Sequence, residues 1–216
     1  MIIRRLITLT IITPSLIGFN SFARPFMNSN AKAVVEHLQS TLVEVMKEAD
    51  ELGYNGRYQK LEATIQESHA FERIAKVAAG RFWDQFTSSQ QSEFIRKFGQ
   101  FSIANYASMF NGFSGEHFKV LVEETQRAGR KLVRTVLIKS DGEEIKLDYI
   151  LAQGSHGWQI INIKTNGISD LALKRAEFTS VIEKEGFDGL LERLDQKIAE
   201  LSSLQNSSLS HSPPDQ

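Results

Sequence analysis

Residues 132–164 read LVRTVLIKSDGEEIKLDYILAQGSHGWQIINIK, and this stretch decides the fold class. It holds three apolar runs, which span 132–139, 145–152 and 158–164. Such runs, rich in β-branched and aromatic residues and bounded by polar turns, are typical of strands. The Asp141-Gly142 pair between the first two runs supplies the positive φ angles of a tight hairpin turn. The stretch therefore predicts three consecutive antiparallel strands.

A fourth strand is predicted just before this stretch. Phe118, Val120 and Val122 alternate with Lys119 and Glu123, which gives the period of two that a half-buried strand shows. We expect Asn166-Gly167 to end the last strand. The prediction is a four-stranded antiparallel meander.

Helical patterns lie on both sides of the predicted sheet. Apolar residues recur every three or four positions in the segments 31–52, 54–68, 71–79, 88–110, 171–184 and 187–204. Asn30 and Thr87 (or Ser88) are the expected N-caps, and Gly53, Gly80 and Gly186 are expected to break or end helices. Helices, then a sheet, then helices again predict an α+β fold in which several helices pack on the sheet.

The predicted sheet carries apolar residues on both faces, as in Val136-Leu137-Ile138 and Tyr149-Ile150-Leu151. A sheet with one wet face would alternate cleanly, so part of the second face must be covered. Extra helix packing is one explanation. The other is an apolar cavity for a greasy ligand, between a curled sheet and the Phe-rich helix over 88–110.

The candidate residues for the lining of such a cavity come from the Phe-rich helix and from the strands. They are Phe98, Phe101, Tyr106, Phe110, Val122, Val136, Ile138, Tyr149, Leu151 and Trp158. Membership of an ordinary core is the alternative for each of them, because aromatic and aliphatic side chains are buried without any ligand.

The N-terminus has the layout of a secretory signal peptide over residues 1–23. Arg4 and Arg5 precede an apolar run from Leu6 to Phe19, and small residues suit cleavage after Ala23. The alternative is a membrane anchor, which needs a longer run of ~20 apolar residues. We expect an exported protein with one domain over 24–201, followed by a disordered Ser-, Asn- and Pro-containing tail over 202–216.

Composition argues against several other functions. The chain has 25 basic and 26 acidic residues, which is not the basic surface that nucleic-acid binding needs. It has no cysteine, and its five histidines lack the spacing of a zinc site, so no cofactor and no metal are expected. Gly112-Phe113-Ser114-Gly115 follows a helix rather than a strand, so it does not fit a nucleophile elbow. We expect no enzyme activity.

Three segments near the C-terminal half together resemble a known family. They are Gly157-Trp158-Gln159-Ile160-Ile161-Asn162-Ile163, Asn166-Gly167-Ile168-Ser169 and Arg175-Ala176-Glu177-Phe178. They are similar to the signature of the MlaC (toluene-tolerance) family of exported phospholipid-binding proteins, with Asn162 where that family usually has Asp. The resemblance covers about residues 31–201.

Other segments are similar to the hopanoid-biosynthesis-associated branch of that family. They are residues 110–118, 171–178, 185–191 and 197–201. The resemblance implies a periplasmic lipid carrier that shuttles phospholipid or hopanoid between inner- and outer-membrane complexes. The implied partners are an MCE/ABC transporter or an RND-type exporter, together with an outer-membrane lipoprotein complex. A lipid-modifying hydrolase and an adaptor that binds no lipid are the alternatives.

Overall fold

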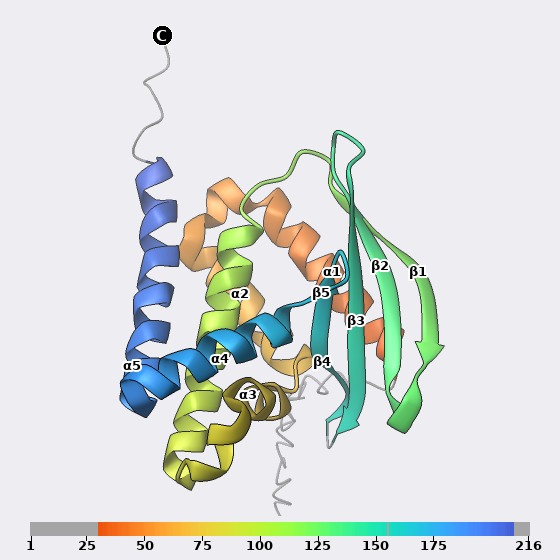
Figure 1. Cartoon of the computed structure of the whole chain (residues 1–216). Helices are drawn as coiled ribbons and strands as arrows, with labels where there is room; N and C mark the ends of the chain where they lie inside the picture. The colour runs from red at the N-terminus through yellow and green to blue at the C-terminus, as the bar shows by residue number, and fades with distance from the viewer. Residues whose placement is uncertain (1–29, 155, 210–216) are drawn as a thin grey trace, which may run out of the picture.

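The computed structural model describes residues 30–154 and 156–209, with side chains described as far as Ser203. Within this part of the chain the helices are α1 (Ala31–Lys47), α2 (Ala49–Ser68), α3 (Phe71–Ala79), α4 (Ser88–Met109) and α5 (Asp170–Leu209), with short 3-10 helices η1 (Gly80–Gln85) and η2 (Arg127–Gly129). The strands are β1 (His117–Thr125), β2 (Lys131–Ile138), β3 (Glu144–Gly154), β4 (Gly157–Thr165) and β5 (Ile168–Ser169). Figure 1 shows the sheet on one side and the helices on the other, which confirms the α+β class.

The described sheet has five strands in the order β1-β2-β3-β4-β5, each antiparallel to its neighbour. The prediction of four strands was wrong because Asn166-Gly167 does not end the meander. Asn166 has φ 51° and Gly167 has φ 86°, and Thr165 pairs with Ile168 across them. Two consecutive positive φ angles make a tight hairpin turn, so the chain folds back into β5 before α5 begins.

The turn between β2 and β3 fixes the register of the sheet. Lys139 N–H donates to the Glu143 carbonyl at 2.9 Å, Gly142 N–H donates to the Lys139 carbonyl at 3.0 Å, and Gly142 has φ 86°. Val133 therefore pairs with Tyr149, and Val136 pairs with Lys146. Directly paired residues point to the same face, so the odd-numbered residues of β2 and β3 share one face and the even-numbered residues share the other.

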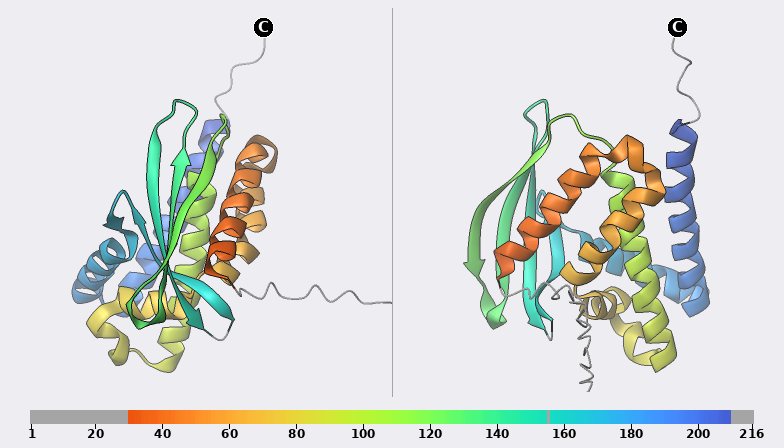
Figure 2. Two further views of the ribbon diagram at one scale, coloured as in Figure 1. Left: turned by 90° about the vertical axis from the view of Figure 1, so that its right-hand side faces the viewer. Right: turned by 180° about the vertical axis from the view of Figure 1, so that it is seen from behind.

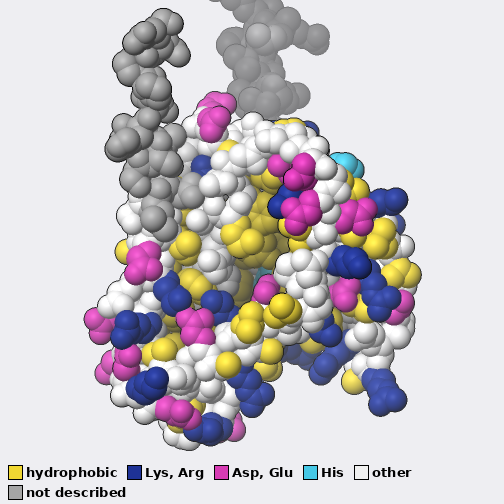
Figure 3. All heavy atoms as spheres, turned by 45° about the horizontal axis from the view of Figure 1, so that its top comes forward, with side chains coloured by type: hydrophobic (Ala, Val, Ile, Leu, Met, Phe, Trp, Pro, Cys, Tyr) yellow, Lys and Arg dark blue, Asp and Glu magenta, His cyan; other side chains and the backbone are white. Residues whose placement is uncertain are grey.

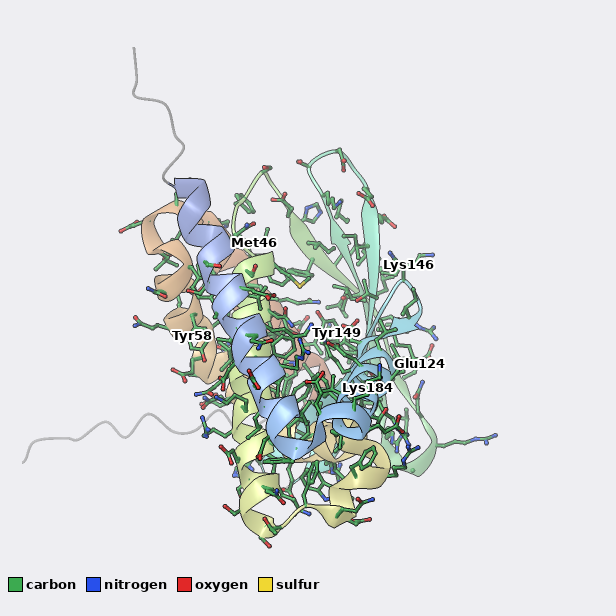
Figure 4. The ribbon with its side chains drawn as sticks, turned by 60° about the vertical axis from the view of Figure 1, so that its left-hand side comes forward. Met46, Tyr58, Glu124, Lys146, Tyr149 and Lys184 are labelled. Carbon is green, nitrogen blue, oxygen red and sulfur yellow. The ribbon has the colours of Figure 1, made fainter. Side chains whose placement is uncertain are left out.

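The odd-numbered face is the one that meets the helices. Gln39 of α1 donates its side-chain amide to Thr135 Oγ1 at 2.9 Å and to Tyr149 OH at 3.4 Å. We call this the inner face and the opposite side the outer face. Figure 4 shows Tyr149 between the sheet and the helices, whereas Lys146 of the same strand lies on the far side. Arg134 and Asp148 pair on the outer face, with 3.7 Å between Nε and Oδ1.

Capping residues start two helices where the sequence predicts. The Asn30 side chain accepts from Lys32 N–H at 2.9 Å at the start of α1. Thr87 and Gln90 form a reciprocal capping box at the start of α4. The first helix ends earlier than expected, at Lys47 rather than 52, and Gly53 with φ 56° lies inside α2.

Helix α5 contains a sharp bend at Gly186, which has φ 74°. The prediction of a break there is confirmed, and Figure 1 shows the two halves of α5 running in different directions. The helix continues to Leu209, so residues 202–209 of the expected tail are helical. The predicted signal peptide and residues 210–216 lie outside the described residues.

The buried residues form two clusters. The first joins α1, α2 and the end of α4 to the inner face, and it includes Leu38, Leu42, Leu61, Ile65, Ile103, Val133, Leu151 and Ile160. The second joins α3, η1, the start of α4 and α5, and it includes Ile74, Trp83, Phe94, Phe98, Phe101, Phe178, Leu190 and Leu194. Figure 2 shows α1 and α2 close to the sheet, and the first half of α5 on the opposite side of α4.

Truncating a side chain of the first cluster should destabilise the fold far more than truncating one on the outer face. Leu38 is 0% exposed, so Leu38→Ala should lower the free energy of unfolding by about 2–5 kcal/mol through lost burial and a cavity. Val122→Ala is the matched control, because Val122 pairs with Arg134 on the outer face, and its change should stay below ~1 kcal/mol. Urea unfolding measures both; equal losses would contradict the assignment of faces.

Candidate functional site

Helix α1 covers only part of the inner face. It is held to β2 and β3 by the hydrogen bonds of Gln39 to Thr135 and Tyr149. Three other apolar residues of the inner face, Phe118, Leu147 and Ile163, pack against the first cluster but keep partial exposure. The register confirms their direction, because Ile163 pairs with Tyr149 and Leu147 with Thr135. The helices therefore leave part of the apolar inner face uncovered.

The end of α4 provides the surface that faces these strand residues. Tyr106 and Phe110, one turn apart, are stacked with their ring centroids 5.9 Å apart, and both are partly exposed. The ring centroid of Phe110 lies 6.5 Å from the ring centroid of Phe118 in β1. The rings of Tyr106, Phe110 and Phe118 thus form a row from the end of α4 to β1, and each of them is partly exposed.

Figure 3 shows hydrophobic side chains gathered in a hollow between the helical side and the sheet. We give the name hollow to the region bounded by Tyr106 and Phe110 at the C-terminal end of α4 and by Phe118, Leu147 and Ile163 of the inner face, all of which are partly exposed. The hydrophobic surface in Figure 3 is open in this view. The enclosed apolar cavity that the sequence predicts is not shown.

His69 contacts Tyr106, one of the residues that border the hollow. His69 lies between α2 and α3, where the Ala70 N–H donates to the Ile160 carbonyl at 2.9 Å and so ties this junction to β4. His69 Nδ1 lies 3.1 Å from the Ile65 carbonyl oxygen and 2.9 Å from Ser68 Oγ. On the other side of the ring, His69 Nε2 lies 3.3 Å from Tyr106 OH.

Burial controls the ionisation of these groups. Desolvation lowers the pKa of His69 to about 4, and the hydrogen bond to the Ile65 carbonyl only partly opposes this. Burial also raises the pKa of Tyr106 well above its usual value, with the Tyr149 and Asp170 side chains adding to the effect. Tyr106 is nevertheless partly exposed.

The structure separates the ten predicted lipid-binding residues into three groups. Tyr106, Phe110, Tyr149, Leu151 and Trp158 pack in or against the first cluster. Phe98 and Phe101 belong to the second cluster, away from the sheet. Val122, Val136 and Ile138 lie on the outer face, because Val136 pairs with Lys146, Ile138 with Glu144 and Val122 with Arg134.

Only Tyr106 and Phe110 of these ten border the hollow. Tyr149 and Leu151 are 3% and 0% exposed, so they are core residues beneath it. Trp158 lies five residues from Ile163 along β4, which is about 16 Å in a strand. Val122, Val136 and Ile138 are turned away from α4 by the register.

Sequence reasoning missed four residues of this region. Two of them could have been predicted from the two-residue period of a strand. Phe118 alternates with Lys119, and Leu147 lies two residues before Tyr149 and therefore on the same face. Ile163 follows from the same two-residue period. His69 carried no such signal, because its partner Tyr106 is 37 positions away in the chain.

Other surface features lie elsewhere. A shallow pocket of ≈ 400 Å³ lies between α2, α4 and α5, and one of ≈ 280 Å³ lies along α5. Within residues 30–154 and 156–209, no His, Asp or Glu side chains group in threes as a metal site would need. In the same ranges, no helix combines the length and apolar character needed to cross a bilayer.

Comparison with known proteins identifies the family of the chain and a solved structure with the same fold. The family model described as "MlaC protein" matches residues 36–196. Among solved structures, the chain is similar to a phospholipid-binding protein from Ralstonia solanacearum in complex with a phospholipid. The two are 24% identical with a TM-score of 0.71, and the match covers 81% of this chain and 99% of that chain, which shows a shared fold. No protein of curated function matches the sequence.

The burial of His69 predicts a specific dependence of stability on pH. The unfolded histidine takes up a proton below its ordinary pKa of about 6.5, while the folded one stays neutral down to about pH 4. Its stabilising contribution is therefore full above pH 6.5 and is lost as the pH falls toward 4, by up to about 3 kcal/mol.

Comparison of the wild type with His69→Gln isolates this effect from the titration of carboxylates. The difference in unfolding free energy between the two should shrink by about 3 kcal/mol from pH 7 to pH 4. His117→Gln, which alters an exposed histidine, should show no such trend. A constant difference for His69→Gln would mean that His69 is hydrated in solution.

Proposed function

Because the chain belongs to the MlaC family, we propose that it is a lipid carrier that holds the acyl chains of a phospholipid in the hollow. The observation that carries this proposal is the partial exposure of Phe118, Leu147 and Ile163 opposite Tyr106 and Phe110. Apolar side chains on both sides of a concave space, open at one face, suit a hydrocarbon chain that enters and leaves.

The hydrophobic effect gives the size of the driving force. An acyl chain of ~16 methylenes gains on the order of 13 kcal/mol when it leaves water, at ~0.8 kcal/mol for each group. Spontaneous release of such a chain into water is slow. The carrier therefore exchanges its lipid on contact with a membrane or a partner protein rather than by free dissociation.

The chemistry around the hollow favours a carrier over a hydrolase. Ser68 Oγ lies 2.9 Å from His69 Nδ1, but Ser68 is only 3% exposed and its hydroxyl also lies 3.4 Å from the Ile65 carbonyl oxygen. A serine that is buried in this way is not accessible to a substrate, as a nucleophile must be. Ser114 is exposed in the loop after α4, where its N–H donates to the Glu116 carboxylate at 2.5 Å.

Location and partners belong to the same proposal. We place the protein in the periplasm, as the signal-peptide-like N-terminus and the family suggest. A shared fold with a protein solved in complex with a phospholipid supports a phospholipid as the ligand. The comparisons give the family and not its hopanoid-associated branch, so a hopanoid ligand and an RND-type exporter stay predictions from the sequence. An MCE/ABC transporter is the partner expected for a phospholipid carrier.

Lipid that stays with the protein during purification tests the proposal. The protein is purified from its own host without detergent and analysed by native mass spectrometry, and its lipid is then extracted and identified. We expect a phospholipid at close to one molecule per chain. A hopanoid in its place would identify the other branch, and lipid-free protein in repeated preparations would contradict the proposed function.

Filling the hollow should remove lipid without unfolding the protein. Leu147→Trp places extra volume on the partly exposed inner face, where it should occupy the space of an acyl chain and reduce bound lipid roughly tenfold or more, which corresponds to a loss of about 1.4 kcal/mol of binding free energy. Val122→Trp, on the outer face, is the matched control and should retain the lipid of the wild type. Native mass spectrometry gives the occupancy and a thermal melt confirms folding. Equal occupancy in two folded variants would argue against the hollow as the lipid site.

A further inference from the structure

The shallow pocket between α2, α4 and the second half of α5 is separate from the hollow. It has a volume of ≈ 400 Å³, and residues of all three helices line it, among them Tyr58, Gln100 and Ile198. Figure 4 shows Tyr58 on α2, beside the second half of α5. The residues that border the hollow are different ones, so the two regions are distinct. We call this pocket the α2–α5 groove.

Tyr54, which lines the α2–α5 groove, has a buried hydroxyl group without a partner. Its oxygen makes no hydrogen bond within the described part of the chain, and the residue is only 5% exposed. Burial raises the pKa of Tyr54, so the hydroxyl is neutral and can both donate and accept a hydrogen bond. Folded proteins rarely leave such a group unsatisfied. A ligand in the groove can supply the missing partner.

The other polar side chains of the groove are mainly amides and hydroxyls. Those of Asn55, Gln59 and Ser202 form no hydrogen bond within the residues that the structure describes. Gln100 accepts from Arg96 at its Oε1, at 3.0 Å, which leaves its amide N–H groups available. An amide group carries a donor and an acceptor in one plane, and a hydroxyl group is both. The groove therefore presents donors and acceptors side by side.

The lining of the groove carries little effective charge and has an apolar part. Its carboxylate, that of Asp195, is paired with Lys97, with 2.5 Å between Oδ1 and Nζ. This pairing leaves little attraction for a cationic ligand. The rings of Tyr54 and Tyr58, whose centroids are 6.4 Å apart, and the partly buried Ile198 supply apolar surface. A neutral ligand with both polar and apolar faces matches this lining.

We propose that the α2–α5 groove binds a neutral sugar unit, whose hydroxyl groups both donate and accept hydrogen bonds and whose C–H faces pack on the tyrosine rings. An aliphatic chain would leave the Tyr54 hydroxyl and the amides without partners. A proline-rich peptide offers carbonyl acceptors but few N–H donors, so the amide oxygens and Asp195 would lose water without replacement. This second site goes beyond the proposed function, because its ligand lies away from the lipid.

Titration of isotope-labelled protein with maltose and with diacetylchitobiose, followed by NMR, tests the inference. We expect one or both sugars to shift the backbone amide signals of residues 54–59 and 195–202, with a dissociation constant of about 1 mM. Tyr54→Phe removes only the hydroxyl, so it should weaken this binding roughly fivefold. The melting temperature of Tyr54→Phe should be equal to that of the wild type or higher, because the variant no longer buries an unsatisfied group.

Two exposed glutamines of α2 provide a matched pair of variants that should not affect folding. Gln59→Ala, in the groove, should weaken sugar binding, whereas Gln66→Ala, outside it, should not. If neither sugar shifts these signals, or if Tyr54→Phe binds as tightly as the wild type, the hydroxyl serves only water and the inference is wrong. It is also wrong if the peptide acetyl-Ala-Pro-Pro-Ala-amide shifts the same signals and the sugars do not, which would identify a groove for peptides.

Discussion

The pairing of Val133 with Tyr149, fixed by the turn at Gly142, decides which side chains of the sheet meet the helices. A shift of the register by one residue would exchange the two faces of β2 relative to β3. Thr135 would then no longer lie beside Tyr149, and the amide of Gln39 could not bond both hydroxyls, as it does now. The position of α1 on the sheet follows from this register. So does the strip of inner face that α1 leaves accessible.

The two buried clusters differ in where they lie: the second is between helices, whereas the first is between helices and the sheet. Phe94, Phe98 and Phe178 lie within 5.6–5.9 Å of one another and are buried between α4 and α5. Aromatic residues of the first half of α4 are thus part of a buried core between helices. The first cluster differs from the second in that Tyr106 and Phe110, which pack against it, keep partial exposure.

Much of the fold was predictable from local chemistry. The caps at Asn30 and Thr87, the break at Gly186 and the antiparallel strands follow from signals a few residues long. The β5 strand was missed although Asn166-Gly167 is a strong hairpin signal, because only two residues follow before the helix. The prediction that Val136 and Ile138 line the same pocket as Tyr149 and Leu151 did not take account of the β2–β3 register, which puts the two pairs on opposite faces of the sheet. The contact of His69 with Tyr106 depends on tertiary structure, which no local pattern encodes.

The central claim is that hydrocarbon occupies the space between the end of α4 and the inner face. A phospholipid with a photoreactive diazirine in one acyl chain tests it most directly, with the crosslinked peptides identified by mass spectrometry. The account predicts crosslinks to Phe118, Leu147, Ile163 and the Tyr106–Phe110 turn. Crosslinks confined to outer-face residues such as Val122 and Ile138, or to the pocket between α2 and α5, would contradict it.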